Sequence, residues 1–572
     1  MTKLCKTTKA QDPDVCEGSI ALEGPIVANS LRGLDIGSHT SRLACVAFMG
    51  LCSYPEVRPH NVTFPSPKPK TSRPTPSGLD PIHVVHFSDI HIDPFYVVGA
   101  NANCSKPICC REYTDADTPG NNAFPAGPNG EHACDAPVSL EESMYAAIQE
   151  IVPDAAFSIF TGDIVDHAVW DTSEQQNTVA VRDAYDRMLG ADMLVVYGTA
   201  GNHEASPANS FPPTAAATAN NSSSASQWLY DLLSSAWAPW IGPQAAVATR
   251  EFGAYAARYS GGGGGDDRGE GRGTLRVISL STNLYYGHNY WLYEEPMETD
   301  PSGQLAWLVR ELDAAEMAGE RVYIIGHMPM GARDAFHDGS NYFDQIVNRY
   351  SATIAAMFFG HTHYDEFQLS YADYANRSHA NALAMSYIAP SMTPTSGHPS
   401  FRVYDVDPVT FGVLDATTYV ANMSDPAFST GGRPRWTRYY SAREAYGALP
   451  GGSVDELTPA FWHNVTVALE ANATAFGEFF DRRKRGWDVE DCDEKCRRAE
   501  ICKLRAARAQ DNCVPPGFEF DSLEGGEDGA RVRLEKQECE ESVVRDTLGA
   551  MVLDSNMLSA FEAMVVEEVL HI

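Results

Sequence analysis

Short apolar runs alternate with helical stretches from about residue 82 onward. Six runs have the length of a β-strand: IHVVHFSD (82–89), AAFSIFTGD (155–163), MLVVYGTAGN (193–202), TLRVISLS (274–281), RVYIIGH (321–327) and IAAMFFGH (354–361). Each run ends in a polar or glycine-bearing turn, which is a usual end of a strand. Strands that alternate with helices predict an α/β fold, in which ligands gather at the carboxyl ends of the strands.

The same pattern divides the chain into five parts. We expect a helical segment at 1–58, a stiff proline-rich linker at 59–81, an α/β domain at 82–420, a cysteine-bearing domain with helix-like spacing at 421–520, and an acidic tail at 521–572. The tail ends in LSAFEAMVVEEVLHI (558–572), which predicts an amphipathic terminal helix. Two low-complexity stretches, 217–226 and 260–273, predict mobile surface insertions.

Composition narrows the class of protein. The 572 residues carry a formal net charge of -34 and a pI near 4.8. That charge argues against a nucleic-acid partner and leaves no basic patch for anionic lipids. Hydrophobic residues make up 44% of the chain, enough for a sizeable core. No apolar run reaches the ~18 residues of a spanning helix, so we expect no transmembrane anchor.

The cysteines and sequons indicate the compartment. Thirteen cysteines fall into the groups Cys5, Cys16, Cys45 and Cys52; Cys104, Cys109, Cys110 and Cys134; and Cys492, Cys496, Cys502 and Cys513, with Cys539 alone. Irregular spacing and the adjacent pair Cys109-Cys110 argue against zinc ribbons. Asn-x-Ser/Thr sequons lie at Asn61, Asn103, Asn220, Asn221, Asn376, Asn422, Asn464 and Asn472. Together they predict a disulfide-bonded glycoprotein that is secreted or lysosomal/vacuolar.

Five motifs follow the predicted strands, each where an apolar run stops. They are Asp89-Ile90-His91, Gly162-Asp163, Gly201-Asn202-His203-Glu204, Gly326-His327 and Gly360-His361-Thr362-His363. If the strands lie side by side, these turns converge on one edge of the sheet. Their imidazoles, carboxylates and amide suit zinc, iron or manganese, whereas calcium would take oxygen ligands only.

One such motif alone is weak, because a lone Gly-His is more often a turn with a satisfied histidine. His-x-His is a better pair of ligands, since an extended strand places both imidazoles on one face. The five motifs in order predict a metal centre formed by Asp89, His91, Asp163, Asn202, His327, His361 and His363.

The motif order D-x-H, GD, GNH(D/E), H, GHxH resembles that of the calcineurin-like metallophosphoesterases over residues 89–363. The resemblance implies an αββα sandwich with a dinuclear metal site. One ion would bind Asp89, His91, Asp163 and His363, and the other Asp163, Asn202, His327 and His361, with Asp163 bridging. Two ions about 3.5–4 Å apart can share a hydroxide that attacks phosphorus and can clamp the phosphoryl oxygens. Purple acid phosphatases carry a tyrosine where this chain has Asp166, so that subfamily is not expected.

Flanking segments resemble the acid sphingomyelinase family over nearly all of 82–515. They are SDIHIDPFY, PICCREY, EHACD, TGDIVDHAVW, YIAPSMTP, FRVYDVD, REAYG and PAFWHN. The resemblance implies two Zn²⁺ per chain and hydrolysis of sphingomyelin to ceramide and phosphocholine at acid pH. It also implies the disulfides Cys104–Cys109, Cys110–Cys134, Cys492–Cys496 and Cys502–Cys513, and gives Cys539 no obvious partner.

Two histidines outside the ligand set are candidates for catalysis. By the same resemblance, His167 and His203 lie over the scissile phosphate. We expect His203, held by Glu204 or a neighbouring carboxylate, to protonate the departing alkoxide, and His167 to bind the phosphate. The alternative for His167 is an exposed or merely supporting histidine.

The first 58 residues bear on lipid binding. Residues 5–52 resemble the second half of a saposin-like domain, a helical domain that draws lipid from a membrane. By this resemblance Cys5 and Cys16 pair with each other, and the partners of Cys45 and Cys52 lie upstream of Met1. The opening MTKLCKTTKAQDPD shows no signal peptide, so we expect a natural N-terminus farther upstream. We expect contact with a membrane or lipid surface through this segment; the alternative is a free helical cap with reactive thiols.

Two other functions remain open. Related secreted phosphodiesterases prefer nucleotides or other small phosphodiesters and would use the same dinuclear site. A lipid-binding protein with a vestigial site is a third, non-enzymatic interpretation, which the complete set of expected ligands makes improbable.

Overall fold

The computed structural model describes residues 1–8, 11–50, 52–70, 72–193, 195–214, 226–259, 273–449, 454–513, 543–545 and 547–548. Nearly all of the two low-complexity stretches, most of the acidic tail, its expected terminal helix and Cys539 lie outside the described residues.

Two six-stranded sheets form the centre of the described part of the chain. In spatial order, the first contains β12 (Trp436–Ser441), β11 (Val413–Ala421), β10 (Ser400–Val406), β1 (Ile82–Phe87), β2 (Ala155–Phe160) and β3 (Val196–Gly198). The second contains β4 (Tyr255–Tyr259), β5 (Leu275–Ser279), β6 (Arg321–Ile325), β7 (Ile354–Phe359), β9 (Ala382–Ile388) and β8 (Glu366–Tyr371). All six predicted strands are confirmed, as β1, β2, β3, β5, β6 and β7.

Both sheets are mixed. The strands β1, β2 and β3 run parallel, and so do β5, β6, β7 and β9, while the outer strands β10 to β12, β4 and β8 pair antiparallel. The ring of Phe358 on β7 lies 5.6 Å from His86 on β1 and 5.1 Å from Tyr404 on β10, so the sheets pack face to face. One hydrophobic cluster fills the space between them.

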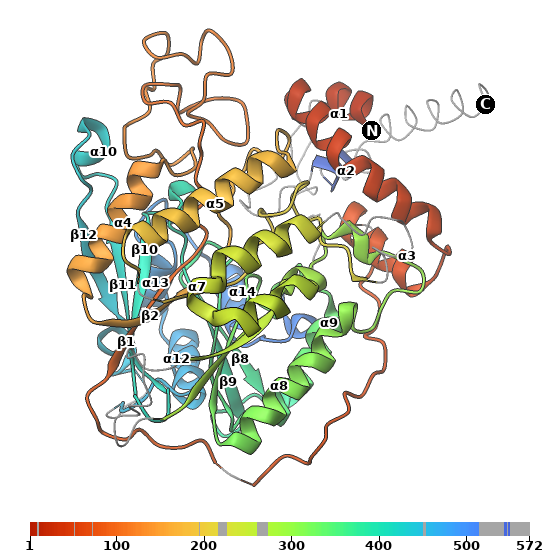
Figure 1. Cartoon of the computed structure of the whole chain (residues 1–572), viewed down its shortest axis with the longest axis vertical. Coiled ribbons are helices and arrows are strands. Elements are labelled where there is room, and N and C mark those ends of the chain that lie inside the picture. Colours follow the sequence, from red (N-terminus) through yellow and green to blue (C-terminus); the bar gives the residue numbers. More distant parts are fainter. Residues whose placement is uncertain are drawn as a thin grey trace.

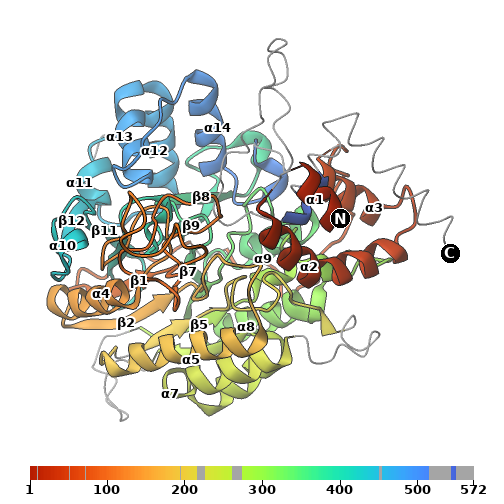
Figure 2. The same cartoon turned by 90° about the horizontal axis from the view of Figure 1, so that it is seen from above.

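Helices cover the outer faces of the two sheets (Figures 1 and 2). On the first sheet, α4 (Val138–Ile151) brings Tyr145 to 5.9 Å from Phe87, and α5 (Glu174–Gly190) brings Tyr185 to 6.1 Å from Phe160. On the second, α8 (Gln304–Ala318), α9 (His337–Arg349) and α12 (Pro459–Ala471) contact β6, β8 and β9. The layers are therefore helix, sheet, sheet, helix. The long α7 (Gln227–Phe252), kinked at Gly242, packs beside β3 and β4.

One expectation for the C-terminal part was wrong. Strand β12 lies beyond residue 420, in the stretch expected to be helical, and pairs antiparallel with β11 at the edge of the first sheet. Helices do follow: α11 (Ala442–Tyr446), α12, α13 (Ala473–Arg483) and α14 (Glu494–Leu504), with a short α10 (Ala427–Thr430) before β12. Short 3₁₀ turns are η2 (Thr282–Tyr285), η3 (Tyr290–Leu292), η4 (Pro301–Gly303), η5 (Tyr374–Asn376), η6 (Pro394–Ser396) and η7 (Ala509–Asp511).

The N-terminal segment is helical, as expected. It contains α1 (Thr2–Thr8), α2 (Pro13–Gly33), α3 (His39–Ala44) and a π-helical turn, η1 (Cys45–Met49). The Cys5–Cys16 disulfide is confirmed. Cys45 and Cys52 differ from expectation: they bond to each other, because the chain reverses at Gly50 and leaves their Cα atoms 5.6 Å apart. The four disulfides implied for the rest of the chain are all present.

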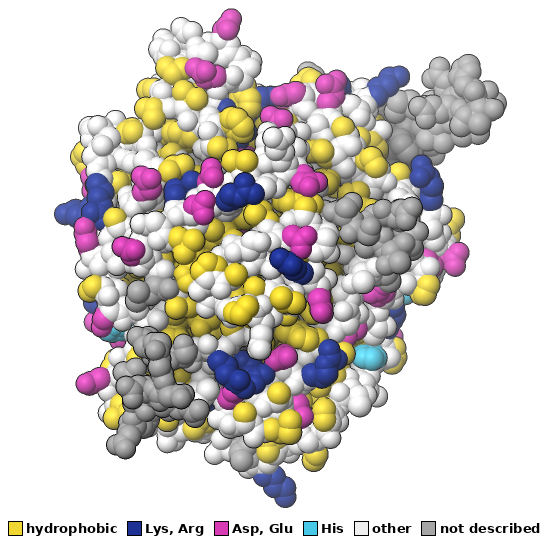
Figure 3. Space-filling view, in the orientation of Figure 1, with side chains coloured by type: hydrophobic (Ala, Val, Ile, Leu, Met, Phe, Trp, Pro, Cys, Tyr) yellow, Lys and Arg dark blue, Asp and Glu magenta, His cyan; other side chains and the backbone are white. Residues whose placement is uncertain are grey.

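The linker at 59–81 has no regular secondary structure in its described residues and runs along the catalytic domain (Figure 1). The flanking Arg58 pairs with Asp338, and within the linker Arg73 pairs with Glu456. Acidic and basic side chains are scattered over the face in Figure 3. Among the described helices, none has the length and apolar character needed to cross a bilayer.

Candidate metal centre

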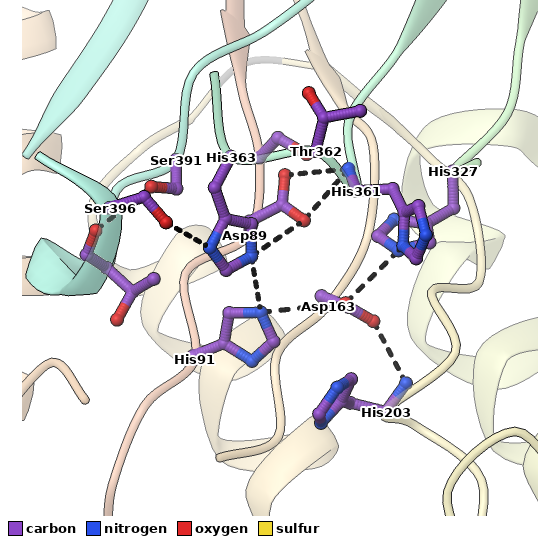
Figure 4. Close-up of polar contacts among 12 residues, drawn as sticks. Asp89, His91, Asp163, His203, His327, His361, Thr362, His363, Ser391 and Ser396 are labelled. Atoms are coloured by element: carbon purple, nitrogen blue, oxygen red, sulfur yellow. Dashed lines mark hydrogen bonds and ion pairs between the residues drawn. The ribbon is translucent and has the colours of Figure 1, made fainter. Parts of the chain in front are cut away.

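The carboxyl ends of five strands from both sheets meet at one place. Asp89 and His91 follow β1, Asp163 follows β2, and Asn202 and His203 follow β3, all from the first sheet. From the second sheet, His327 follows β6, and His361 and His363 follow β7. The side chains converge between the two sheets (Figure 4). The seven expected ligands are therefore together, and each is at most 3% exposed.

Five of these seven residues have a left-handed backbone: Asp89, His91, Asp163, His361 and His363, with φ of 50°, 35°, 62°, 72° and 60°. Such conformations cost a non-glycine residue free energy and persist where the surroundings fix them, most often at functional sites. The expected geometry of His361-Thr362-His363 was therefore wrong. These residues form a turn after β7, so their rings go to different clusters instead of one face.

His91, His363, Asp89 and Asp163 form the first cluster. The Nε2 atoms of His91 and His363 lie 3.2 Å apart. Asp163 Oδ2 is 3.5 Å from His91 Nε2, and Asp89 Oδ1 is 3.5 Å from His363 Nε2. Burial, with His167 nearby, holds the pKa values of both histidines well below their usual range, so their rings are neutral.

Asp163, His327, Asn202 and His361 form the second cluster. His327 Nε2 lies 2.8 Å from Asn202 Oδ1 and 3.1 Å from Asp163 Oδ2. His361 Nδ1 lies 3.2 Å from Asn202 Oδ1 and 3.3 Å from His327 Nε2. Asp163 belongs to both clusters, which is the position expected of a bridging carboxylate.

Partners behind the rings fix which nitrogen faces the centre. His91 Nδ1 donates to the Val165 carbonyl and His327 Nδ1 to the Thr161 carbonyl, each at 2.7 Å. His361 Nε2 donates to Asp334 Oδ2 at 2.9 Å. Carbonyl and carboxylate oxygens accept these hydrogen bonds, so the outer nitrogen of each ring carries a proton and the inner nitrogen is the one available to a cation.

The inner atoms fit a cation. Lone pairs of His327, His361 and Asn202 face one another, and Asp163 Oδ2 is buried without a hydrogen bond. Burial opposes a charge on His327, yet Asp163 and Asp89 outweigh it and raise its pKa to about 9. Acceptors that converge in this way need a proton or a metal ion between them. The two clusters thus form a candidate dinuclear His/Asp metal site.

His167 and His203 stand beside the first cluster. The His167 ring lies 3.9 Å from that of His91, and the ring of His203 lies 4.8 Å from each of these two. Asp135 accepts from both the backbone N–H and Nδ1 of His167, each at 2.6 Å. His203 Nδ1 faces the Asp166 carbonyl at 3.4 Å.

Of the two alternatives expected to hold His203, Glu204 makes no hydrogen bond to it among the described residues, and a neighbouring carboxylate stays a prediction. Glu204 Oε1 instead accepts from the Ile164 backbone N–H at 2.7 Å, because its side chain turns back under the loop after β2. Burial and the nearby Asp163 raise the pKa of Glu204 to about 8. Glu204 therefore supports the loop that carries Asp163.

Sequence reasoning missed two carboxylates, Asp135 and Asp334. Asp135 lies within the segment EHACD, and Asp334 follows Gly326-His327 by seven residues. Neither stands at a strand end, and the histidines they contact are 32 and 27 residues away in sequence. In the sequence, the only signal for Asp135 and Asp334 was that neither carboxylate had another evident role.

The fold and this site are those of a calcineurin-like, metal-dependent phosphoesterase, and the calcineurin-like phosphoesterase family matches residues 82–365. The chain is 35% identical over 528 residues to a sphingomyelin phosphodiesterase of Homo sapiens and 33% identical over 524 residues to one of Bos taurus. Each comparison covers 89% of this chain and 77% of the relative. A cyclic GMP-AMP phosphodiesterase of Rattus norvegicus is 27% identical over 443 residues, covering 73% of this chain and 88% of that relative. Within the phosphoesterases, the chain belongs to the sphingomyelin phosphodiesterase family.

Proposed function

We propose that this protein hydrolyses sphingomyelin to ceramide and phosphocholine with two Zn²⁺ ions bound per chain. The observation that carries the proposal is the pair of acceptor clusters that share Asp163, with His167 and His203 beside them. The sphingomyelin phosphodiesterases among the relatives give the substrate. Imidazole-rich sites without a tyrosine ligand suit zinc.

The protein's own groups have separate tasks. Asp89, His91, Asp163 and His363 would hold one ion, and Asp163, Asn202, His327 and His361 the other. Bound metal ions supply Lewis-acid activation of water and neutralise charge on the phosphoryl oxygens. Asp334 and the carbonyls of Val165 and Thr161 keep the imidazoles aimed inward.

His167 and His203 would serve the phosphate and the leaving group. An alkoxide needs a proton as it departs, and a histidine can donate it. Asp135 accepts from Nδ1 of His167 at 2.6 Å and fixes its ring, whereas His203 has a backbone carbonyl at 3.4 Å. This contrast favours His167 as the proton donor and His203 as the phosphate-binding partner, the reverse of the expectation from sequence.

The assignment of the acid is tested with His167→Asn and His203→Asn. Loss of the proton donor should lower kcat strongly for sphingomyelin but less for an ester whose leaving group is a nitrophenolate, which departs without protonation. Loss of the phosphate-binding residue should lower turnover of both substrates alike. A leaving-group dependence confined to His203→Asn would return the acid role to His203.

A nucleotide or other small phosphodiester is the second candidate substrate, because the cyclic GMP-AMP phosphodiesterase covers the same part of this chain. We propose parallel assays at pH 5 on sphingomyelin vesicles, ATP and CDP-choline, with and without a chelator. Chelator-sensitive turnover of sphingomyelin supports the first proposal. Nucleotide turnover without lipid turnover would overturn it. Metal-free protein without any activity would favour the lipid-binding interpretation.

The compartment is part of the proposal. Six disulfides stabilise the described chain, which suits an extracytoplasmic protein. The sequons Asn61, Asn103, Asn376, Asn422 and Asn472 are exposed, as glycosylation requires. We therefore propose a glycoprotein that is secreted or located in lysosomes or vacuoles. Contact with lipid would use the N-terminal helices, the part that resembles half of a saposin-like domain.

A further inference from the structure

Residues 543–545 and 547–548, described within the C-terminal part of the chain, pack against the N-terminal helical segment. Val543, Val544 and Leu548 are 4%, 2% and 7% exposed. Val544 and Leu548 share one hydrophobic cluster with Leu4, Val27, Leu43, Ala44 and Phe48 of the N-terminal helices. Val543 shares another with Cys5, Val15 and Cys16. In Figure 2 the blue residues 543–545 and 547–548 stand beside the red helices α1 and α2.

The catalytic domain supplies the third side of both clusters. Tyr290, Tyr293 and Phe336 join the first, and Ala168 and Trp170, on the loop that carries His167, join the second. Helix α2 approaches that loop closely: a Cβ on Gly18 would stand 2.0 Å from the Trp170 carbonyl oxygen. Ser30 Oγ also donates to the Tyr290 carbonyl at 2.7 Å.

A small cleft of about 30 Å³ lies at this junction. Leu43, Val46 and Tyr54 of the N-terminal segment, Tyr293 and Asp334 of the catalytic domain, and Arg545 line it. Asp334, which lines the cleft, accepts the hydrogen bond of His361. One side chain therefore joins the wall of the cleft to an expected metal ligand. Arg545 Nη1 lies 3.4 Å from His288 Nε2 on the opposite wall.

Without Val543, Val544 and Leu548, the apolar side chains of the N-terminal helices would keep the catalytic domain on one side but would be open to water on the other. The sequence predicted a half domain whose missing part lies upstream of Met1. The occupant seen here comes from the other end of the same chain, and its Val-Val-x-x-x-Leu spacing suits one face of a helix.

We propose that residues 543–548 are the built-in core partner of the N-terminal helices, so that the two ends of the chain form one helical unit. This unit lines the cleft beside the metal centre and admits lipid substrate to it. The role in lipid turnover rests on the proposed function, whereas the packing role does not.

The packing role is tested in the full chain with Val544→Asp combined with Leu548→Asp. Buried carboxylates at these positions should open the unit and speed tryptic cleavage at Lys3, Lys6, Arg32 and Arg42 by about 10-fold or more. The matched control is Val247→Asp, because Val247 is 64% exposed on α7. Equal cleavage rates in wild type, variant and control would overturn the proposal.

The role in lipid turnover is tested on the same proteins with sphingomyelin vesicles and with a soluble nitrophenyl phosphodiester. The expected result is a loss of about 10-fold or more for the vesicles, with soluble turnover within about two-fold of wild type. Addition of a synthetic peptide of residues 536–572 to a chain that ends at residue 520 should restore vesicle turnover.

Two outcomes would overturn the role in lipid turnover. Faster vesicle turnover by the variant would make the C-terminal segment an inhibitory plug, and equal turnover would make it a structural element without a part in lipid access. If wild-type protein hydrolyses no sphingomyelin, the proposed function fails, and the cleavage experiment still decides the packing role by itself.

Discussion

Asp163 is the residue on which both clusters depend, since its carboxylate lies near His91 on one side and His327 on the other. Asp163→Asn keeps the volume but removes the charge, so we expect bound metal to be lost and kcat/KM to fall by about 10³-fold or more. Elemental analysis and hydrolysis of a nitrophenyl phosphodiester measure both. The control is Asp171→Asn, on an exposed residue of the same loop. Full metal content in Asp163→Asn would contradict this role.

Asp334 acts on the metal centre through His361. Asp334→Asn weakens the hydrogen bond that fixes the ring and its tautomer, so we expect metal affinity to fall about 10- to 100-fold. Competition against a chelator measures the affinity. Turnover at saturating metal should stay near the wild-type value, because Asp334 does not face the inner atoms of the cluster. An unchanged affinity would show that the ring is held by packing alone.

The residue types at the centre were predictable because each motif stands where an apolar run ends. The carboxylates Asp135 and Asp334 were not, because the sequence distance to their histidines hides the contact. The predicted contact between Glu204 and His203 was not found, for a related reason. Adjacency to His203 in sequence suggested a contact, whereas the backbone turn sends the side chain toward Ile164.

At the scale of elements, the close approach of the strand ends is what brings the ligands together. Gly360, directly after β7, stands where a Cβ would meet Ser88 Oγ at 2.0 Å and Asp89 Oδ2 at 2.6 Å. We expect Gly360→Ala to displace the turns after β1 and β7, with a loss of about 1–3 kcal/mol in stability and reduced metal binding. Urea unfolding and elemental analysis check these effects.

The matched control is Gly190→Ala at the end of α5, where the new methyl group meets no atom within 4 Å. It should leave metal content unchanged. The free energy of unfolding should rise by a few tenths of a kcal/mol or more, because alanine restricts the unfolded chain. Equal stability and metal content in Gly360→Ala and Gly190→Ala would show that the metal centre does not need the close approach of the turns after β1 and β7.

Buried strands that read as continuous apolar runs were predictable, such as Ile354 to Phe359 in β7, whereas β9 and β10 are also largely buried and were not predicted. The edge strands β4 and β12 were missed because their exposed positions carry polar or large aromatic side chains, which weakens the periodic signal. The disulfide Cys45–Cys52 depends on the turn at Gly50, a local conformation that the cysteine pattern alone did not indicate.

At the scale of the whole molecule, the contact between residues 543–548 and the N-terminal helices had no signal in the sequence, since it joins the two ends of the chain. The response of stability to pH is also a property of the whole molecule, because buried groups act with opposite signs. Burial lowers the pKa of His132 to about 4, so its contribution is present above pH 6.5 and lost as the pH falls toward 4.

Asp344 on α9 has the opposite effect on stability, because its pKa is raised. Burial, against the hydrogen bond from Tyr374, raises its pKa from 3.8 to about 6. The folded chain therefore holds this proton more tightly, and the contribution is present below pH 3.8 and lost as the pH rises through 6. The loss amounts to about 2 kcal/mol between pH 4 and pH 7.

Asp344→Asn removes this titration, so the variant should gain free energy of unfolding relative to wild type, by on the order of 2–3 kcal/mol, as the pH rises from 4 to 7. Urea unfolding at pH 4, 5, 6 and 7 measures the difference. The control is Asp231→Asn, whose side chain is 54% exposed on α7 and should follow wild type. A constant difference between Asp344→Asn and wild type over this range would mean that the Asp344 carboxyl titrates alike in both states. Acid stability would then have to come from other buried carboxyls, such as Glu141, whose pKa burial raises to about 7.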